Sequence, residues 1–228
     1  LETVLDCVYN PFRTELLLRA EELGVPAYCG FEMLVAQAVY AAEHFTGQKL
    51  PEAVIADTHR KLKRDLSNVA IIGMPGCGKS TIGRALAKTL GKTYVDLDEV
   101  IEKNTGMPIP DIFAREGEAS FRKYESQAVA EISKQTRQVI ACGGGVIKSP
   151  ANTRALRQNG PVLWVRRPLE VLATGGRPLS KGGAALKQLE AERTPLYEAA
   201  STVVLENYGS LTAAVDKAVQ LFEADERL

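Results

Sequence analysis

Residues 73–80 form a glycine-rich octapeptide that constrains the fold more than any other stretch of the chain. They read Gly-Met-Pro-Gly-Cys-Gly-Lys-Ser and fit the pattern G-x-x-x-x-G-K-[ST]. In that pattern the backbone N–H groups of the loop turn inward around phosphate oxygens. Lys79 supplies a charge for the outer phosphates, and the Ser80 hydroxyl is a ligand for Mg²⁺. The octapeptide therefore predicts a site for a nucleoside triphosphate.

The flanking segments support this interpretation over a glycine-rich turn with a chance lysine. An apolar run of strand length, residues 68–72, precedes the loop. Residues 80–90 follow with apolar side chains at helical spacing, and Gly91 is a stop signal. The N-terminus of that helix adds positive charge near the phosphates. The predicted nucleotide contacts within the loop and helix are Gly76, Cys77, Gly78, Lys79, Ser80 and Thr81.

The remainder of the chain after Asn68 alternates between strands and helices. Predicted strands at 93–96, 138–142, 161–165 and 201–205 are separated by helical stretches, and a helix at 211–224 closes the chain. Such alternation predicts an α/β fold with a five-stranded parallel sheet and helices on both faces. Ligands should then gather at the carboxyl ends of the strands.

The first part of the chain has a different character. Residues 1–50 predict a strand at 4–9 and helices at 14–23 and 31–45, which make a small, mostly helical appendage. Residues 51–67 predict a polar, partly helical connector to a domain at 68–228. Its basic run at 59–65 is expected to be a solvated face, with a phosphate-binding patch as the alternative.

Composition excludes several classes of function. The 28 basic and 28 acidic residues cancel, so no basic face is implied and nucleic acid is not an expected partner. No apolar run is long enough to span a bilayer, and no signal peptide opens the chain. The four cysteines form no C-x-x-C pair and there are only two histidines, which argues against zinc and for free thiols in the cytoplasm.

Further motifs follow the later strands and narrow the second substrate. Asp96 and Asp98 come at the end of the second strand, where alternate side chains face opposite sides, so one could reach a metal and the other an acceptor. An acidic pair at a helix start is the alternative. Arg122 and Glu125 share a helix face at i, i+3, although such pairs are often surface ion pairs.

Two glycine-rich segments complete the set. Residues 143–145 are three glycines that leave room for a small ligand, with a flexible turn as the alternative. Residues 174–183 place Arg177 between glycines, which is typical of a lid that delivers a cation, although an ordinary surface loop would read similarly. Arg193 lies further on, within the motif at 192–197.

Together these motifs resemble the shikimate kinase family over residues 68–225, in the family's order and spacing. The resemblance implies ATP- and Mg²⁺-dependent phosphorylation of the 3-hydroxyl of shikimate, in the pathway to aromatic amino acids. It implies that Asp98 accepts the proton and that Arg122 and Arg193 hold the substrate carboxylate. Other implied shikimate contacts are Gly143, Gly144 and Gly145. By the same resemblance Lys79 and Arg177 are catalytic, with Arg177 closing onto ATP, and Ser80 and Asp96 hold the metal, the latter through water.

The chain departs from the family pattern near the nucleotide. Ala141 stands where a serine is frequent, which bears on the water shell around the metal. Leu172 and Ala173 stand where an arginine often stacks on adenine, and Asn207 is a candidate for the adenine side. Cys77 is interpreted as a small residue at a variable position. The alternative is a thiol activated by Lys79 and the helix N-terminus, whose modification would block ATP.

Residues 6–11, 14–17 and 30–37 resemble the C-terminal end of shikimate dehydrogenase, in which positions matching Tyr9 and Gln37 face shikimate. The catalytic lysine and aspartate and the dinucleotide loop of that family are absent here, so this stretch is not expected to transfer hydride. The resemblance predicts a dehydrogenase–kinase fusion with a monomeric kinase domain. A chance helical pair is the alternative.

Two other functions compete with shikimate phosphorylation. One is another small-molecule kinase of the same fold, acting on gluconate or a nucleoside monophosphate. The other is a catalytically silent nucleotide-binding module that regulates a partner enzyme. The intact set Lys79, Asp98, Arg122, Arg177 and Arg193 argues against the silent module.

Overall fold

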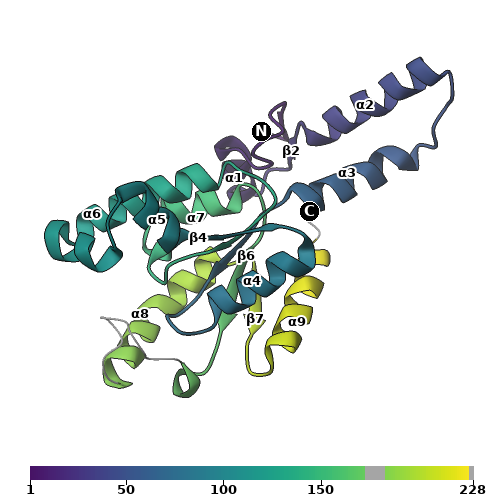
Figure 1. Cartoon of the computed structure of the whole chain (residues 1–228). Helices are drawn as coiled ribbons and strands as arrows, with labels where there is room; N and C mark the ends of the chain where they lie inside the picture. Colours follow the sequence, from purple (N-terminus) through teal and green to yellow (C-terminus); the bar gives the residue numbers. More distant parts are fainter. Residues whose placement is uncertain (173–182, 226–228) are drawn as a thin grey trace.

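Strand β3 (Val69–Ile72) runs through the centre of a parallel sheet in the computed structural model, which describes residues 1–172 and 183–225 (Figure 1). The strand order is β4–β5–β3–β6–β7, and every pairing is parallel. The other strands are β4 (Thr93–Asp96), β5 (Gln138–Ala141), β6 (Val162–Arg166) and β7 (Val203–Glu206). All four residues of β3 are buried, as expected for a strand covered on both faces. The predicted five-stranded parallel sheet is confirmed.

Helices cover both faces of the sheet. Helices α4 (Lys79–Leu90) and α9 (Leu211–Glu223) pack against each other on one face (Figure 1). The opposite face carries α5 (Leu97–Thr105), α6 (Ile109–Ile132), α7 (Pro150–Arg157) and α8 (Gly183–Ala200), with short 3₁₀ turns η1 (Val146–Lys148) and η2 (Leu169–Val171). Within residues 1–172 and 183–225, no helix combines the length and apolarity needed to cross a membrane.

The N-terminal unit, residues 1–66, is built around a small parallel strand pair, β1 (Val4–Asp6) with β2 (Ala27–Cys29). Its helices are α1 (Glu15–Glu22), α2 (Phe31–Thr46) and α3 (Ala53–Leu66). Thr14 caps α1 by accepting a hydrogen bond from Leu17 N, and Gly47 ends α2 with a left-handed φ of 68°. The strand predicted at 4–9 stops at Asp6, because the Asp6 carboxylate accepts from Val8 N and turns the chain.

The predicted connector, residues 51–67, is almost entirely helix α3. Ile55 and Leu66 of this helix pack against the buried side chains of Phe12, Phe31 and Val35. The helix therefore shares the core of the N-terminal unit and leads directly into β3. The domain boundary at residue 50 stays a prediction.

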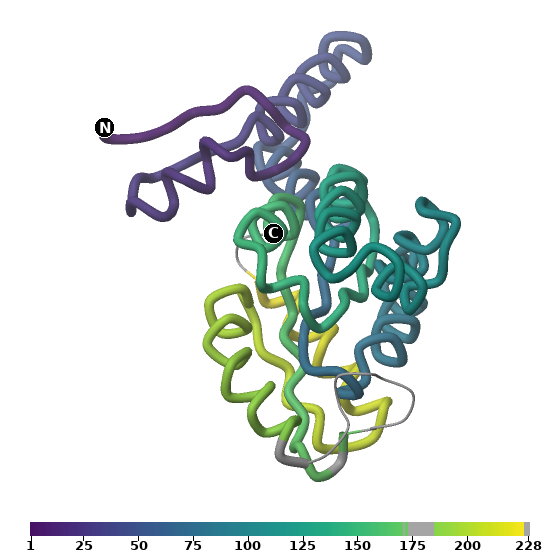
Figure 2. The backbone as a smooth tube through the Cα atoms, turned by 90° about the vertical axis from the view of Figure 1, so that its left-hand side faces the viewer, coloured from purple at the N-terminus to yellow at the C-terminus, as the bar shows by residue number. Residues whose placement is uncertain are grey.

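The N-terminal unit contacts the main domain at the amino ends of the strands (Figure 2). Lys92, which precedes β4, donates from Nζ to the carbonyls of Arg64, Asp65 and Ser67 at 2.9, 2.8 and 2.7 Å. A lysine at the C-terminus of α3 satisfies carbonyls that have no partner within the helix and complements the helix dipole. Ligand sites of parallel sheets lie at the other end of the strands.

Asn159 makes a buried side-chain hydrogen bond between the main domain and the N-terminal unit. Its Oδ1 accepts from Phe12 N at 3.0 Å, while its Nδ2 donates to Ser133 O at 2.9 Å and to Asn10 Oδ1 at 3.3 Å. The side chain is 1% exposed, so water cannot replace these partners easily.

Asn159→Ala should therefore lower the free energy of unfolding by about 3 kcal/mol, because it leaves the Phe12 N–H and the Ser133 carbonyl buried without partners. Urea titration followed by circular dichroism measures this loss. Asn104→Ala is the matched control, since Asn104 donates to Glu131 at the exposed surface, and it should cost no more than about 0.5 kcal/mol. Equal effects of the two substitutions would contradict the prediction.

Candidate active site

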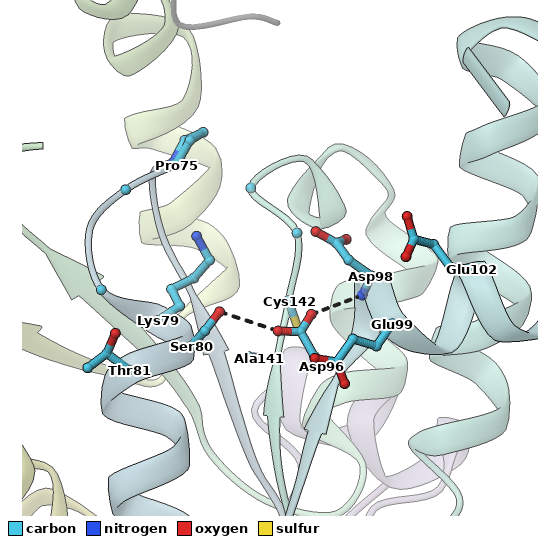
Figure 3. A pocket seen from close by; sticks show the side chains of 14 residues that line it. Pro75, Lys79, Ser80, Thr81, Asp96, Asp98, Glu99, Glu102, Ala141 and Cys142 are labelled. Carbon is cyan, nitrogen blue, oxygen red and sulfur yellow. Dashed lines mark hydrogen bonds between the residues drawn. The ribbon is translucent and has the colours of Figure 1, made fainter. Parts of the chain in front are cut away.

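A cavity of about 550 Å³ opens at the carboxyl ends of β3, β4 and β5 (Figure 3). The phosphate loop, residues 73–80, forms one wall with Lys79, and Asp98 and Glu102 lie across from it. The lining residues are Pro75, Gly76, Gly78, Lys79, Ser80, Thr81, Asp96, Asp98, Glu99, Glu102, Ala141, Cys142, Gly143 and Gly144. Because β4, β5 and β3 are adjacent and parallel, the segments that follow them meet at one edge of the sheet.

The phosphate loop has a backbone that only glycine adopts readily. Gly73, Gly76 and Gly78 have φ values of 148°, 82° and 101°. Lys79 Nζ donates to the carbonyls of Gly73 at 2.9 Å and Met74 at 3.0 Å, which holds the ammonium against the start of the loop. The side chain that the sequence places in the outer-phosphate position is therefore fixed by the loop itself.

Burial bears on two residues that the sequence singled out near the nucleotide. Cys77 is fully buried, which favours the small-residue interpretation over an accessible reactive thiol. Asn207 is also buried, and its Nδ2 donates to Cys77 O at 2.9 Å. A Cβ on Gly78 would lie 3.2 Å from the same Nδ2. Asn207 thus holds the backbone of the phosphate loop through its side-chain hydrogen bond, a role that sequence reasoning missed.

Asp96 and Asp98 lie at a strand-to-helix junction. The expectation that these two side chains point to opposite sides is wrong. Residues two apart in an extended segment already face the same side, and here α5 begins at Leu97 with Asp96 as its N-cap. Asp96 Oδ1 accepts from Asp98 N at 3.2 Å, as N-cap side chains do. Both carboxylates consequently line the same cavity.

The other oxygen of Asp96 faces the phosphate loop. Its Oδ2 accepts from Ser80 Oγ at 3.3 Å and from Tyr94 Oη at 2.9 Å. Burial and the Asp96 carboxylate raise the pKa of Tyr94 to about 12, so the hydroxyl keeps its proton at neutral pH. Tyr94 was not among the predicted site residues, although its i, i+2 spacing from Asp96 on one strand could have indicated it.

Arg122 is held by two carboxylates on α6, which is interrupted at Gly117 (φ 82°) just before this stretch. Its Nη1 donates to both oxygens of Glu125 at 3.0 and 2.9 Å, and its Nε and Nη2 donate to Glu118 Oε1 at 3.2 and 3.0 Å. Glu125 is 1% exposed, and this burial raises its pKa while the Arg122 guanidinium opposes the rise. The pair is therefore not a surface ion pair. Glu118 is a second partner that sequence reasoning missed.

The glycine triplet joins the two arginines. Gly144 O accepts from Arg193 Nη1 at 2.8 Å and from Tyr197 Oη at 2.7 Å. A Cβ on Gly145 would lie 2.5 Å from Arg122 Nη1, so only glycine allows this approach. Arg193 is buried on α8, and its Nε finds no acceptor among the residues that the structure describes. The two arginines do not line the main cavity but border it through the triplet.

Trp164 on β6 packs against Tyr197 and is not among the residues that line the cavity. Its ring stacks on that of Tyr197 with centroids 5.7 Å apart and planes 21° from parallel. Burial raises the pKa of Tyr197, which keeps the hydroxyl a donor to Gly144. Of the remaining predictions, Ala141 lines the cavity. Residues 174–182 of the predicted lid, Arg177 among them, lie outside the described residues.

A phosphate loop, a carboxylate pair and two arginines around one cavity define a small-molecule kinase of the P-loop class. The sequence profile of the shikimate kinase family matches residues 75–223. The chain is 40% identical over 162 residues to shikimate kinase of Nitrosomonas europaea, and the aligned region covers 67% of this chain and 77% of that protein. It is 39% identical over 166 residues to shikimate kinase of Aromatoleum aromaticum, covering 68% and 95%.

A solved structure agrees with these relatives. Shikimate kinase from Acinetobacter baumannii in complex with shikimate superposes with a TM-score of 0.67 at 34% identity, covering 73% of this chain and 98% of that one. The chain belongs to the shikimate kinase family, and its activity is the ATP-dependent phosphorylation of shikimate. The gluconate and nucleoside monophosphate alternatives are thereby set aside.

The N-terminal unit has a family match of its own. Residues 30–58 match the profile described as shikimate 5'-dehydrogenase C-terminal domain. The match extends through α2 into α3, so it includes part of the predicted connector. The resemblance to a dehydrogenase fragment is confirmed.

Gly145→Ala should raise the KM for shikimate at least about tenfold, because a displacement of catalytic-site groups by an ångström is costly and the new methyl would displace the Arg122 guanidinium. The backbone tolerates alanine here, since φ is −103° and ψ is −3°. Steady-state kinetics with either substrate varied measures the effect. The KM for ATP is the internal control, and an equal rise in both would contradict a local effect on Arg122.

Proposed function

We propose that the chain transfers the γ-phosphoryl group of ATP to the 3-hydroxyl of shikimate, with Asp98 accepting the hydroxyl proton. The observation that carries this assignment is that Asp98 and Lys79 line one cavity from opposite walls. A carboxylate there can orient a sugar-like hydroxyl toward the phosphate loop, and phosphoryl transfer depends mainly on such positioning and on charge neutralisation.

Arg122 and Arg193 would hold the substrate carboxylate. A guanidinium presents N–H groups in a planar fork that matches two carboxylate oxygens. Both arginines adjoin the glycine triplet, where a side chain would collide with them. A ligand carboxylate at this point would replace Glu118 on the fork of Arg122, while Glu125 would continue to hold Nη1. The buried charge of Glu125 thereby keeps Arg122 oriented.

The residues around Ser80 suit a magnesium ion. Ser80 Oγ and Asp96 Oδ2 are 3.3 Å apart, and both are oxygen ligands of the type that Mg²⁺ prefers. We assign the direct contact to Ser80 and a contact through water to Asp96. Bound Mg²⁺ would neutralise charge on the phosphate oxygens, as would Lys79 and, from the segment outside the described residues, Arg177.

Asp98→Asn should lower kcat by about 10² to 10⁴, because general-base catalysis contributes a factor of that size. The affinity for ATP should change little, since Asp98 acts on the other substrate. A coupled assay of ADP release measures kcat, and calorimetry measures ATP binding. Asp216→Asn, which removes an exposed carboxylate on α9, should leave both quantities unchanged.

Equal losses of turnover and ATP affinity in Asp98→Asn would count against a role on the shikimate side. Absence of ADP release by the unchanged protein with shikimate and Mg-ATP would instead favour the silent nucleotide-binding module.

We also propose that the N-terminal unit belongs to a dehydrogenase–kinase fusion in the cytoplasm, with a monomeric kinase domain. The profile match at residues 30–58 supports the dehydrogenase part. The unit has no G-x-G-x-x-G segment for a dinucleotide, so this chain by itself should not reduce a nicotinamide cofactor with shikimate. Absorbance at 340 nm with shikimate and oxidised cofactor tests this, and an increase would contradict it.

A further inference from the structure

The Asp96 carboxylate is fixed at both of its oxygens by protein donors. Asp98 N donates to Oδ1 at 3.2 Å, and Ser80 Oγ donates to Oδ2 at 3.3 Å. The shortest of the contacts is that of Tyr94 Oη, at 2.9 Å to Oδ2. The Asp98 contact is the ordinary capping bond of a helix, and Ser80 belongs to the phosphate-loop motif. Tyr94 belongs to neither, so its hydroxyl is an additional constraint on this carboxylate.

The Tyr94 side chain extends from β4 against α4. A Cβ on Gly83 would lie 3.0 Å from the ring, so the absence of a side chain at that position is what admits the tyrosine. The Arg84 guanidinium lies 4.3 Å from the ring centroid on a second side, and Glu99 in turn holds Arg84 at 3.0 Å. A ring fixed on these sides presents its hydroxyl to Asp96 in one direction.

We propose that Tyr94 is a positioning residue for magnesium: its hydroxyl fixes the rotation of the Asp96 carboxylate so that this carboxylate faces the water shell of the metal beside Ser80. The inference rests on the proposed metal role of Asp96. Groups that hydrogen-bond to metal-site carboxylates orient them, and their loss typically reduces metal affinity about 10- to 100-fold. Tyr94 would thus tune how tightly Mg-nucleotide binds without touching nucleotide or metal.

Tyr94→Phe tests the proposal, because it removes the hydroxyl and keeps the ring against Gly83 and Arg84. Calorimetry should show that ADP binds about tenfold more weakly in the presence of Mg²⁺. Binding of ADP in EDTA should stay within about twofold of the unchanged protein. The Mg²⁺ concentration for half-maximal activity should rise in parallel. Unaltered Mg-ADP binding, or an equal loss with and without Mg²⁺, would overturn the proposal.

Tyr124→Phe is the matched control. Tyr124 Oη also donates to a carboxylate at 2.9 Å, that of Glu116, but at the surface of α6. Its removal should leave nucleotide binding unchanged with and without Mg²⁺. A loss of Mg-ADP affinity as large as that of Tyr94→Phe would show that the effect is not specific to the Asp96 contact and would overturn the proposal.

Asp96→Asn separates this inference from the proposal on which it rests. If Asp96→Asn leaves the Mg²⁺ requirement unchanged, the metal role of Asp96 fails. If it raises the requirement while Tyr94→Phe does not, only the role of Tyr94 fails. When both single substitutions weaken Mg-ADP binding, the double variant should be no weaker than Asp96→Asn alone, because Tyr94 acts through Asp96. Additive losses would overturn the proposal.

Discussion

The parallel pairing of β3 with β5 on one side and β6 on the other is the constraint on which the site depends. In this register Ile71 lies opposite Ala141 on β5 and opposite Leu163 on β6. Strands β3 and β5 therefore end at the same level of the sheet. The phosphate loop, which follows β3, and the glycine triplet, which follows β5, begin beside each other. A slip of one residue in either ladder would turn every side chain of the slipped strand to the opposite face. The chemistry at the carboxyl ends of the strands thus depends on a buried set of strand pairings whose own side chains have no proposed role in the reaction.

The sequence predicted the parts of this arrangement that follow from local patterns. Strand β4 was predicted with the observed bounds, 93–96, and the closing helix was predicted one residue too long at its end, 211–224 against Leu211–Glu223. These elements have clear apolar periodicity and glycine or polar boundaries. The phosphate loop was equally clear, because its lysine and glycines serve a fixed backbone geometry.

Other features of the site depend on residues far apart in the sequence and could not be predicted. Asn207 reaches Cys77 across 130 positions, and Asn159 reaches Phe12 across 147. An asparagine in a loop gives no indication of such a partner. The helical position of Asp98 was only the alternative interpretation, for a different reason. The strand was correctly ended at Asp96, but the capping bond from Asp98 N to Asp96, which marks where the helix begins, has no clear signal in the sequence.

The stacking of Trp164 on Tyr197 gives the protein an internal optical reporter. Trp164 is the single tryptophan of the chain, and Tyr197 donates its hydroxyl to the same Gly144 carbonyl that Arg193 uses. Any shift of the glycine triplet that loosens this bond changes the stacking on the indole ring and hence its emission. Intrinsic fluorescence of the unmodified chain would then follow the acceptor side of the cavity in real time. The signal comes from one known ring on β6, so a change in it can be traced to a defined structural event.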